Sequence, residues 1–263
     1  MSALLPNFSK FYYGFKVNAE PYNGYIDLDE GSGEISVEVP VGTYTLSELV
    51  TVVRQALLDQ ATLDYTVSVD RSSRFITISA TSPFELLTFS GAHSGTSIFS
   101  LLGFNVLADT PSATSHTSVS PAGKAYHPQF LLQSYIGPDD WQQKNEAQVN
   151  VSSSGTSVEV VNFGIAKFAQ FDIKFITNKS MDGVVIQNNP SGLDDARDFL
   201  RYITEKNYFE FIPNVSDVNT YYKVLCESMP DFQDGTGYKL KELWDKGLPG
   251  IFETGIINVR VLE

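Results

Sequence analysis

The stretch that decides the fold begins Val-Gly-Thr-Tyr-Thr-Leu-Ser-Glu-Leu at residues 41–49. Within it, Thr45 is a good helix N-cap, and Glu48, three residues later, completes a capping box. A helix is therefore predicted to begin at this point. Apolar side chains recur at helical spacing along the next turns and give the helix one apolar face: Leu46, Leu49, Val50, Val53 and Leu57. That face is wide enough for a sheet to cover it.

The residues that follow the helix predict this sheet. Residues 65–69 and 74–80 alternate between apolar and polar side chains, which indicates two strands, and residues 70–73 form the turn between them. Before the helix, residues 34–39 alternate in the same way and predict a half-exposed strand. Residues 84–89 predict a further short strand.

A Ser-Leu-Leu-Gly-Phe segment at residues 100–104 closes this region. Residues 97–102 predict one short helical turn, Gly103 supplies the left-handed residue that ends it, and Phe104 folds back onto the turn. We therefore expect residues 34–107 to form a helix-plus-antiparallel-sheet module.

From residue 156 to residue 263 the pattern predicts a second, β-rich domain. The predicted strands span residues 158–163, 168–175, 208–212, 221–227 and 256–262. An amphipathic helix is predicted from Leu193 to Ile203, and a helical turn or two at residues 238–246. Residues 178–189 predict a loop or a short hairpin. The expected fold class is α+β, with a second domain like a β-sandwich or split barrel and with flanking helices.

Two segments lie outside these domains. Residues 1–33 are predicted to form an N-terminal arm that contacts neighbouring subunits, so deletion of residues 1–25 is expected to leave a folded protein. Residues 108–155 are predicted to be a linker or connecting segment, because the run from residue 108 to residue 116 is poor in bulky side chains.

Charge and composition exclude several classes of function. The chain has 263 residues, of which 42% are hydrophobic, enough for a real core. Its 18 Lys and Arg against 31 Asp and Glu give a net charge of −13, which disfavours binding to nucleic-acid phosphates and to anionic membranes. No apolar run approaches the roughly 20 residues of a membrane span, and the N-terminus lacks the basic and apolar regions of a signal peptide. We therefore expect no direct sequence-specific binding to nucleic acid, no membrane partner, and assembly in a cytoplasm.

The sequence carries no recognisable catalytic, cofactor or metal motif. No P-loop or dinucleotide fingerprint occurs. Cys226 is the one cysteine, so no intrachain disulfide forms, and its apolar neighbours indicate a buried thiol. With only three histidines, at positions 93, 116 and 127, a zinc site is disfavoured. We predict no cofactor, no metal and no enzymatic activity.

Two kinds of carboxylate chemistry stay open as alternatives. The acidic run at residues 27–34 suits calcium, but an EF-hand's other ligands are missing, so an acidic solvated turn is favoured. Paired carboxylates of a hydrolase meet only in space, and the candidates Asp139, Asp140 and Glu227 have no special sequence context.

The first half resembles a module of tailed-bacteriophage and other large-virus structural proteins. Four segments carry the resemblance, and they span Gly42–Leu46, Tyr65–Val69, Phe75–Ser79 and Leu101–Phe104, within residues 34–106. The second half resembles, in layout, the split-barrel plan of tail-tube, distal-tail and baseplate hub proteins. The segments concerned are Phe168–Thr177, the Leu193–Ile203 helix and Ile256–Leu262.

This resemblance implies a structural subunit of a bacteriophage virion, in the tail, baseplate or neck. Its expected partners are tail-tube, sheath, hub or neck subunits and further copies of itself in a ring, and its expected location is the virion, assembled in the host cytoplasm. Because the chain carries a whole module beyond a simple tube subunit, a peripheral position is favoured over the tube wall.

Aromatic side chains are the predicted contact residues, because Tyr and Phe are enriched at subunit interfaces. The predicted contacts are Tyr12, Tyr13, Tyr22, Tyr25, Phe104, Tyr126 and Phe130. The alternative function is a host-surface glycan-binding module used in adsorption, with Trp141 and the tyrosines stacking on sugars.

Overall fold

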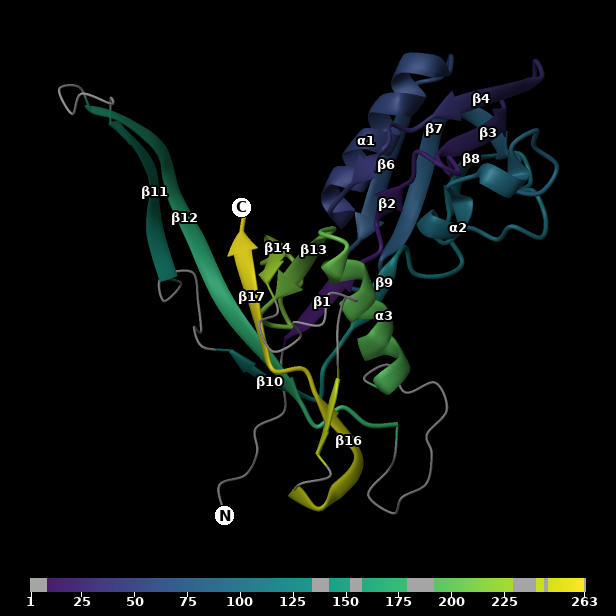
Figure 1. Ribbon diagram of the computed structural model, residues 1–263. Helices are drawn as coiled ribbons and strands as arrows, with labels where there is room; N and C mark the ends of the chain where they lie inside the picture. Colours follow the sequence, from purple (N-terminus) through teal and green to yellow (C-terminus); the bar gives the residue numbers. More distant parts are fainter. Residues whose placement is uncertain are drawn as a thin grey trace.

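Antiparallel sheets dominate the fold, which is α+β (Figure 1). In this computed structural model, residues 9–133, 142–151, 158–178, 192–228, 240–243 and 246–262 are described. A five-stranded sheet belongs to the first half of the chain, and an eight-stranded sheet mostly to the second half. The first sheet consists of β3 (Tyr25–Asp29), β4 (Glu34–Glu38), β6 (Tyr65–Asp70), β7 (Phe75–Leu86) and β8 (Ala113–Thr117).

The eight-stranded sheet has the order β10-β12-β17-β14-β13-β1-β9, and β11 also pairs with β12. Its strands are β1 (Lys10–Tyr13), β9 (Lys124–Tyr126), β10 (Phe130–Gln133), β11 (Gln142–Val151), β12 (Val158–Lys174), β13 (Tyr208–Ile212), β14 (Tyr222–Ser228) and β17 (Ile256–Val261). Two small ribbons complete the described strands, namely β2 (Lys16–Val17) with β5 (Gly42–Thr43), and β15 (Lys241–Leu243) with β16 (Leu248–Glu253).

The predicted helix is α1 (Leu46–Gln60), and its capping box is confirmed. The Glu48 N–H donates to Thr45 Oγ1 (3.2 Å), and the Thr45 N–H donates to Glu48 Oε2 (2.8 Å). The apolar face lies against the sheet and is buried at Leu46, Leu49, Val53, Ala56 and Leu57, whereas Val50 is half-buried. One helix covering one face of an antiparallel sheet gives this half its core.

The predicted hairpin is also confirmed, with β6 and β7 in register from Tyr65 opposite Ala80 to Asp70 opposite Phe75. The separate strand expected at residues 84–89 does not exist. Instead β7 continues to Leu86, where its far end pairs with β3, so one long strand pairs with β6, β8 and β3.

The Leu-Leu-Gly-Phe closure behaves as predicted. The helical turn α2 (Phe99–Leu102) follows the 3-10 turn η1 (Ser94–Thr96) and ends at Gly103, whose φ is +84°. The Phe104 N–H donates to the Phe99 carbonyl (2.9 Å). A side chain at position 103 would collide with the Ser120 carbonyl, so both the backbone angle and the close approach require glycine.

The N-terminal strand corrects two domain predictions. β1 lies inside the eight-stranded sheet, with β13 on one side and β9 on the other, and β2 and β3 also pair within the protein, so residues 9–33 are not an arm. Residues 108–155 are not a simple linker either, because they supply β8 to the first sheet and β9, β10 and β11 to the second. The arm prediction was wrong because β13 and β9, the partners of β1, lie far away in the sequence, and the linker prediction was wrong because a segment poor in bulky side chains still contributes strands.

An aromatic core fixes β1 in place. The Phe11 ring packs among five other rings, with centroid distances of 4.8 to 6.5 Å, from Phe171, Phe199, Phe209, Phe211 and Tyr126. Phe199 comes from α3 (Leu193–Thr204), the predicted second-half helix, whose apolar side covers this face of the sheet. Residues on β1, β9, β12, β13 and α3 therefore share one core.

The second half differs from a split barrel. Its sheet is open, and the described residues form no closed barrel. The two strands predicted at residues 158–163 and 168–175 are one strand, β12. The helical turn predicted at residues 238–246 was wrong over 241–243, which form β15, and most of the loop predicted at 178–189 lies outside the described residues.

Replacement of Leu49 by Asp tests the burial of α1. The Leu49 side chain is completely buried, so Leu49→Asp is expected to destabilise the protein by at least about 4 kcal/mol, since it removes apolar contacts and places a carboxylate in the core. The matched control is Thr51→Asp, on the exposed side of the same helix turn. Chemical denaturation measures the stability of both variants. Equal denaturation midpoints for the two would contradict the packing of α1 against the sheet.

Candidate functional site

A buried ion pair holds the two sheets in one arrangement. Arg71, in the β6–β7 turn, pairs with Glu210 on β13, and both side chains are nearly or fully buried. The Arg71 guanidinium also donates to the Val218 carbonyl (2.9 Å) and to Ser47 Oγ (2.8 Å). Glu210 Oε1 accepts the Leu46 N–H (2.7 Å), at the N-terminus of α1.

These contacts join four segments, namely the β6–β7 turn, the start of α1, β13 and the loop that carries Val218. Tyr12 on β1 adds a fifth, because its hydroxyl donates to the Arg71 carbonyl (2.8 Å). Burial raises the pKa of the Glu210 carboxyl, and the adjacent Arg71 charge opposes that shift. We call this cluster around Arg71 and Glu210 the joint. Its role is structural, because its polar groups bind one another inside the protein.

A long hairpin projects from the eight-stranded sheet. β11 pairs with β12 from Gln142 opposite Phe168 to Val151 opposite Val158, with a bulge between Glu146 and Ala147. β17 reaches β12 only over residues 167–172. Among the described strands, residues 158–166 of β12 therefore have no neighbour except β11. Figure 1 shows this two-stranded ribbon extending well beyond the rest of the sheet.

Within the part of the chain that the structure describes, no strand pairs with either outer edge of the ribbon. A two-stranded hairpin alone is marginally stable in water, because few contacts offset its conformational entropy. Its outer N–H and C=O groups are available to pair with another strand. The sequence of residues 158–166, Val-Glu-Val-Val-Asn-Phe-Gly-Ile-Ala, favours a β-strand and contains one charge and no proline. Such an edge is typical of a strand that another chain covers.

The first half also presents apolar side chains on fixed loops. Phe89 and Leu107 are 60% and 79% exposed. Their loops are tied together, because Thr88 Oγ1 donates to the Ala108 carbonyl and Asp109 Oδ1 accepts the Phe89 N–H, each at 2.7 Å. These exposed groups are held in position and not left on loose segments.

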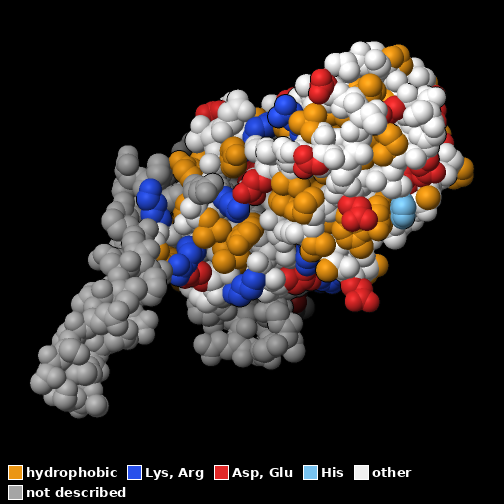
Figure 2. Space-filling model, turned by 90° about the horizontal axis from the view of Figure 1, so that it is seen from above, with side chains coloured by type: hydrophobic (Ala, Val, Ile, Leu, Met, Phe, Trp, Pro, Cys, Tyr) orange, Lys and Arg blue, Asp and Glu red, His pale blue; other side chains and the backbone are white. Residues whose placement is uncertain are grey.

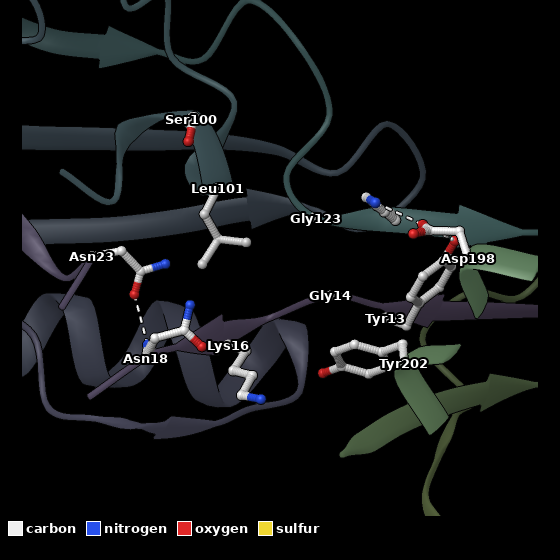
Figure 3. Close-up of a pocket in the computed structure, with 11 residues that line it drawn as sticks. Tyr13, Gly14, Lys16, Asn18, Asn23, Ser100, Leu101, Gly123, Asp198 and Tyr202 are labelled. Atoms are coloured by element: carbon white, nitrogen blue, oxygen red, sulfur yellow. Dashed lines mark hydrogen bonds and ion pairs between the residues drawn. The ribbon is translucent and has the colours of Figure 1, made fainter. Parts of the chain in front are cut away.

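A hollow of about 510 Å³ lies at the junction of the two halves (Figure 3). One wall carries Asn18 and Asn23 from the loop after β2, and α2 contributes Ser100 and Leu101. The opposite wall consists of Tyr13, Lys124, Asp198 and Tyr202, from β1, β9 and α3. Gly14, Lys16 and Gly123 complete the lining.

The charges of the hollow are paired within the protein. Asp198 Oδ2 accepts hydrogen bonds from the Tyr13 hydroxyl (3.0 Å) and from Lys124 Nζ (2.6 Å). Lys16 Nζ lies 3.5 Å from Glu205 Oε2. Burial, together with Asp198, raises the pKa of the Tyr13 hydroxyl, and burial raises that of Tyr202, so both phenols stay protonated.

Most of the predicted contact residues lie inside the protein. Tyr12, Tyr13, Tyr126 and Phe104 are at most 5% exposed, so in this fold they cannot reach a neighbouring subunit, and the prediction was wrong for them. Tyr12 and Phe104 belong to the core of the first half, and Tyr13 and Tyr126 belong to the core around Phe11 and α3.

The remaining contact residues have other positions. Tyr22 and Tyr25 are half-buried and pack edge to face (4.7 Å between centroids), which leaves part of each ring accessible. Phe130 lies on β10 opposite Lys174, and its side chain is outside the described part of the structure, as is the whole of Trp141. The contact role of Tyr22, Tyr25 and Phe130 stays a prediction.

Asp27, His93 and Ser36 come together, but not as a catalytic relay. The Ser36 hydroxyl donates to Asp27 Oδ1 (2.7 Å), and His93 Nδ1 lies 3.1 Å from Asp27 Oδ1 and 3.2 Å from Ser36 Oγ. A serine nucleophile needs its hydroxyl on one ring nitrogen and the carboxylate on the other. Here both contact Nδ1, so the cluster ties β3, β4 and the loop before η1 together.

The acidic run at residues 27–34 is an ordinary hydrogen-bonded turn. Asp29 Oδ1 accepts the N–H groups of Gly31 (2.7 Å) and Gly33 (3.0 Å). Glu30 accepts the Leu63 N–H (3.1 Å) and the Tyr65 hydroxyl (2.9 Å), beyond the end of α1. The carboxylates thus point to different partners. The described residues contain no group of three or more His, Cys, Asp or Glu side chains placed to hold a metal ion.

Cys226 is a buried thiol, as predicted. Burial raises its pKa to about 11, which is opposite to the shift of a reactive cysteine. Within the described residues, no helix has the length and apolar character needed to cross a membrane. On the face shown in Figure 2, the described Lys and Arg side chains are scattered among Asp and Glu and form no continuous basic surface.

Sequence reasoning missed the joint and the hollow. Arg71 and Glu210 are 139 residues apart in the sequence, and the residues of the hollow come from five separate segments. The one available signal was the polar side of the predicted Leu193–Ile203 helix, where Asp198 lies, whereas Tyr202 packs against the apolar core. Comparison with known protein families and with curated proteins finds no match for this chain.

Proposed function

We propose that the protein is a structural subunit of a bacteriophage virion, in the tail or baseplate, that acts by multimeric assembly. The observation that carries this proposal is the two-stranded ribbon of β11 and β12, which extends beyond the sheet and has no neighbour on either edge among the described strands. A neighbouring copy or another virion subunit that pairs with one edge would supply the backbone hydrogen bonds that the ribbon lacks.

Two further features support an assembly role over catalysis. Phe89 and Leu107 expose large apolar side chains on loops fixed by hydrogen bonds, and such groups are suited to burial at a contact. The acidic net charge of −13 keeps unassembled copies soluble by mutual repulsion. The Ser36–His93–Asp27 cluster lacks the geometry of a relay, and the Cys226 thiol is not activated.

Shortening the hairpin tests this proposal. A variant that joins Lys144 directly to Ala166 through Asn-Gly removes the projecting length but keeps the part of β12 that pairs with β17. We expect this variant to fold normally and to fail in self-association and in incorporation into particles. Light scattering and particle composition measure the two effects, and circular dichroism checks the fold.

A second variant separates strand pairing from simple length. It replaces residues 145–165 with a Gly/Ser segment of equal length, which does not form a β-ribbon. This variant is expected to fail like the shortened one. If either variant assembles as well as the natural chain, the ribbon is not the contact that builds the particle, and the proposal fails.

A further inference from the structure

Two cations of the protein lie beside one aromatic ring without a carboxylate partner. Seven of the described Lys and Arg residues are buried or half-buried, and five of these pair with an Asp or a Glu, namely Lys16, Arg71, Lys174, Lys223 and Arg260. The other two are Lys10 and Arg74, and no described carboxylate pairs with either of them. In a chain with 31 Asp and Glu residues, these two cations are an exception that composition does not explain.

The ring of Tyr12 lies next to both cations. Lys10 Nζ is 4.7 Å from the centre of this ring, and the Arg74 guanidinium carbon is 5.2 Å from it. Burial lowers the pKa of Lys10, and the Arg74 and Arg71 charges lower it further. The Lys10 ammonium group is thus surrounded by like charge, a situation that a nearby carboxylate would relieve.

Arg74 has unused hydrogen-bond donors. Its Nη1 donates to the Ala122 carbonyl (2.9 Å), and its other guanidinium N–H groups have no partner in the described part of the chain. Asp70, at the start of the same turn, instead accepts the Ser72 N–H (3.0 Å) and the Ser73 hydroxyl (2.7 Å). The Arg74 backbone is left-handed (φ +61°), so an arginine here adds strain that glycine would avoid.

The complementary charges lie on the other side of the eight-stranded sheet. Lys10 and Tyr12 share one face of β1, because side chains alternate along a strand, whereas α3 packs on the opposite face. In the first turn of α3, Asp195 is half-buried and has no hydrogen-bond or ion-pair partner among the described residues. Burial, together with the carboxylates of Asp198 and Asp194, raises the pKa of Asp195.

We propose that Lys10 and Arg74 of one copy bind Asp194 and Asp195 of a second copy. The two pairs have opposite charge, and they do not meet within one chain because the sheet separates them. A contact between two different surfaces of the same chain is heterologous, and its repetition builds a ring or a filament. This inference rests on the assembly role proposed above, and it adds a second contact to that of the ribbon.

Charge reversal in the full chain tests this contact, with light scattering over a range of concentrations. Lys10→Glu and Asp195→Lys are each expected to weaken self-association at least tenfold, because each places like charges opposite one another. The double variant restores opposite charges at every contact and should regain association. Arg54→Glu is the matched control, since Arg54 is exposed on α1, has no described ion pair, and gives the same change in net charge as Lys10→Glu.

Circular dichroism checks that each variant is folded. The proposal is overturned if Lys10→Glu associates as well as Arg54→Glu, if the double variant is no better than the single ones, or if the natural chain stays monomeric. Loss of particle incorporation without a change in self-association would assign the two cations to another acidic subunit and would also overturn it. The hairpin variants keep all four charged residues, so normal assembly of those variants would count against the ribbon and not against this contact.

Discussion

A chain that lacks residues 1–13 is expected to lose cooperative folding of its eight-stranded sheet. The deletion removes β1, which separates β13 from β9, and with it Phe11, whose ring contacts five others at the centre of the core. It also removes the Tyr12 hydroxyl that binds the Arg71 carbonyl at the joint. The gap would expose two strand edges and an apolar cavity at once.

Chemical denaturation followed by near-ultraviolet circular dichroism measures the loss. A milder variant is Phe11→Ala, which is expected to lower the free energy of unfolding by about 3–5 kcal/mol, as for other buried Phe residues. A deletion of residues 1–8 keeps every described contact of β1 and serves as the control. A chain lacking residues 1–13 that unfolds with the same midpoint and slope as the control would show that β1 is not an integral strand.

The sequence predicted that a chain without residues 1–25 still folds, whereas the structure predicts that loss of residues 1–13 prevents cooperative folding. The reason for the difference is physical. The capping box at Thr45 and the glycine stop at Gly103 were predictable, since each depends on residues within one or two helical turns. The β6–β7 hairpin was predictable for the same reason, because its register follows from a turn of four residues.

Strands with distant partners carry no such local signal. Lys10 pairs with Ile212, some two hundred residues away, and nothing in the first thirty residues indicates that partner. Aromatic residues in β1 therefore suited an exposed contact arm equally well. The same ambiguity misplaced Tyr126 and Phe104, because enrichment in Tyr and Phe is shared by interfaces and by cores.

The joint between the halves depends on the same long-range pairing, and its energetics make the second large prediction. Loss of either charge at Arg71 or Glu210 leaves the other buried and uncompensated, which typically costs about 3–5 kcal/mol. Glu210→Gln isolates this effect, since the amide oxygen still accepts the Leu46 N–H while the negative charge is gone. Arg71→Met also loses the bonds to Val218 and Ser47 and is expected to be at least as destabilising.

The double variant Arg71→Met with Glu210→Gln removes both charges. Because burial already disfavours the ionised form of Glu210, the double variant should be more stable than the sum of the single effects predicts, by about 1–3 kcal/mol. Arg197→Met, which breaks an exposed pair with Asp194, is the control and should change stability little. A double-mutant cycle from urea denaturation gives the coupling. Additive effects of the two substitutions would mean that the two buried charges do not stabilise each other in the joint.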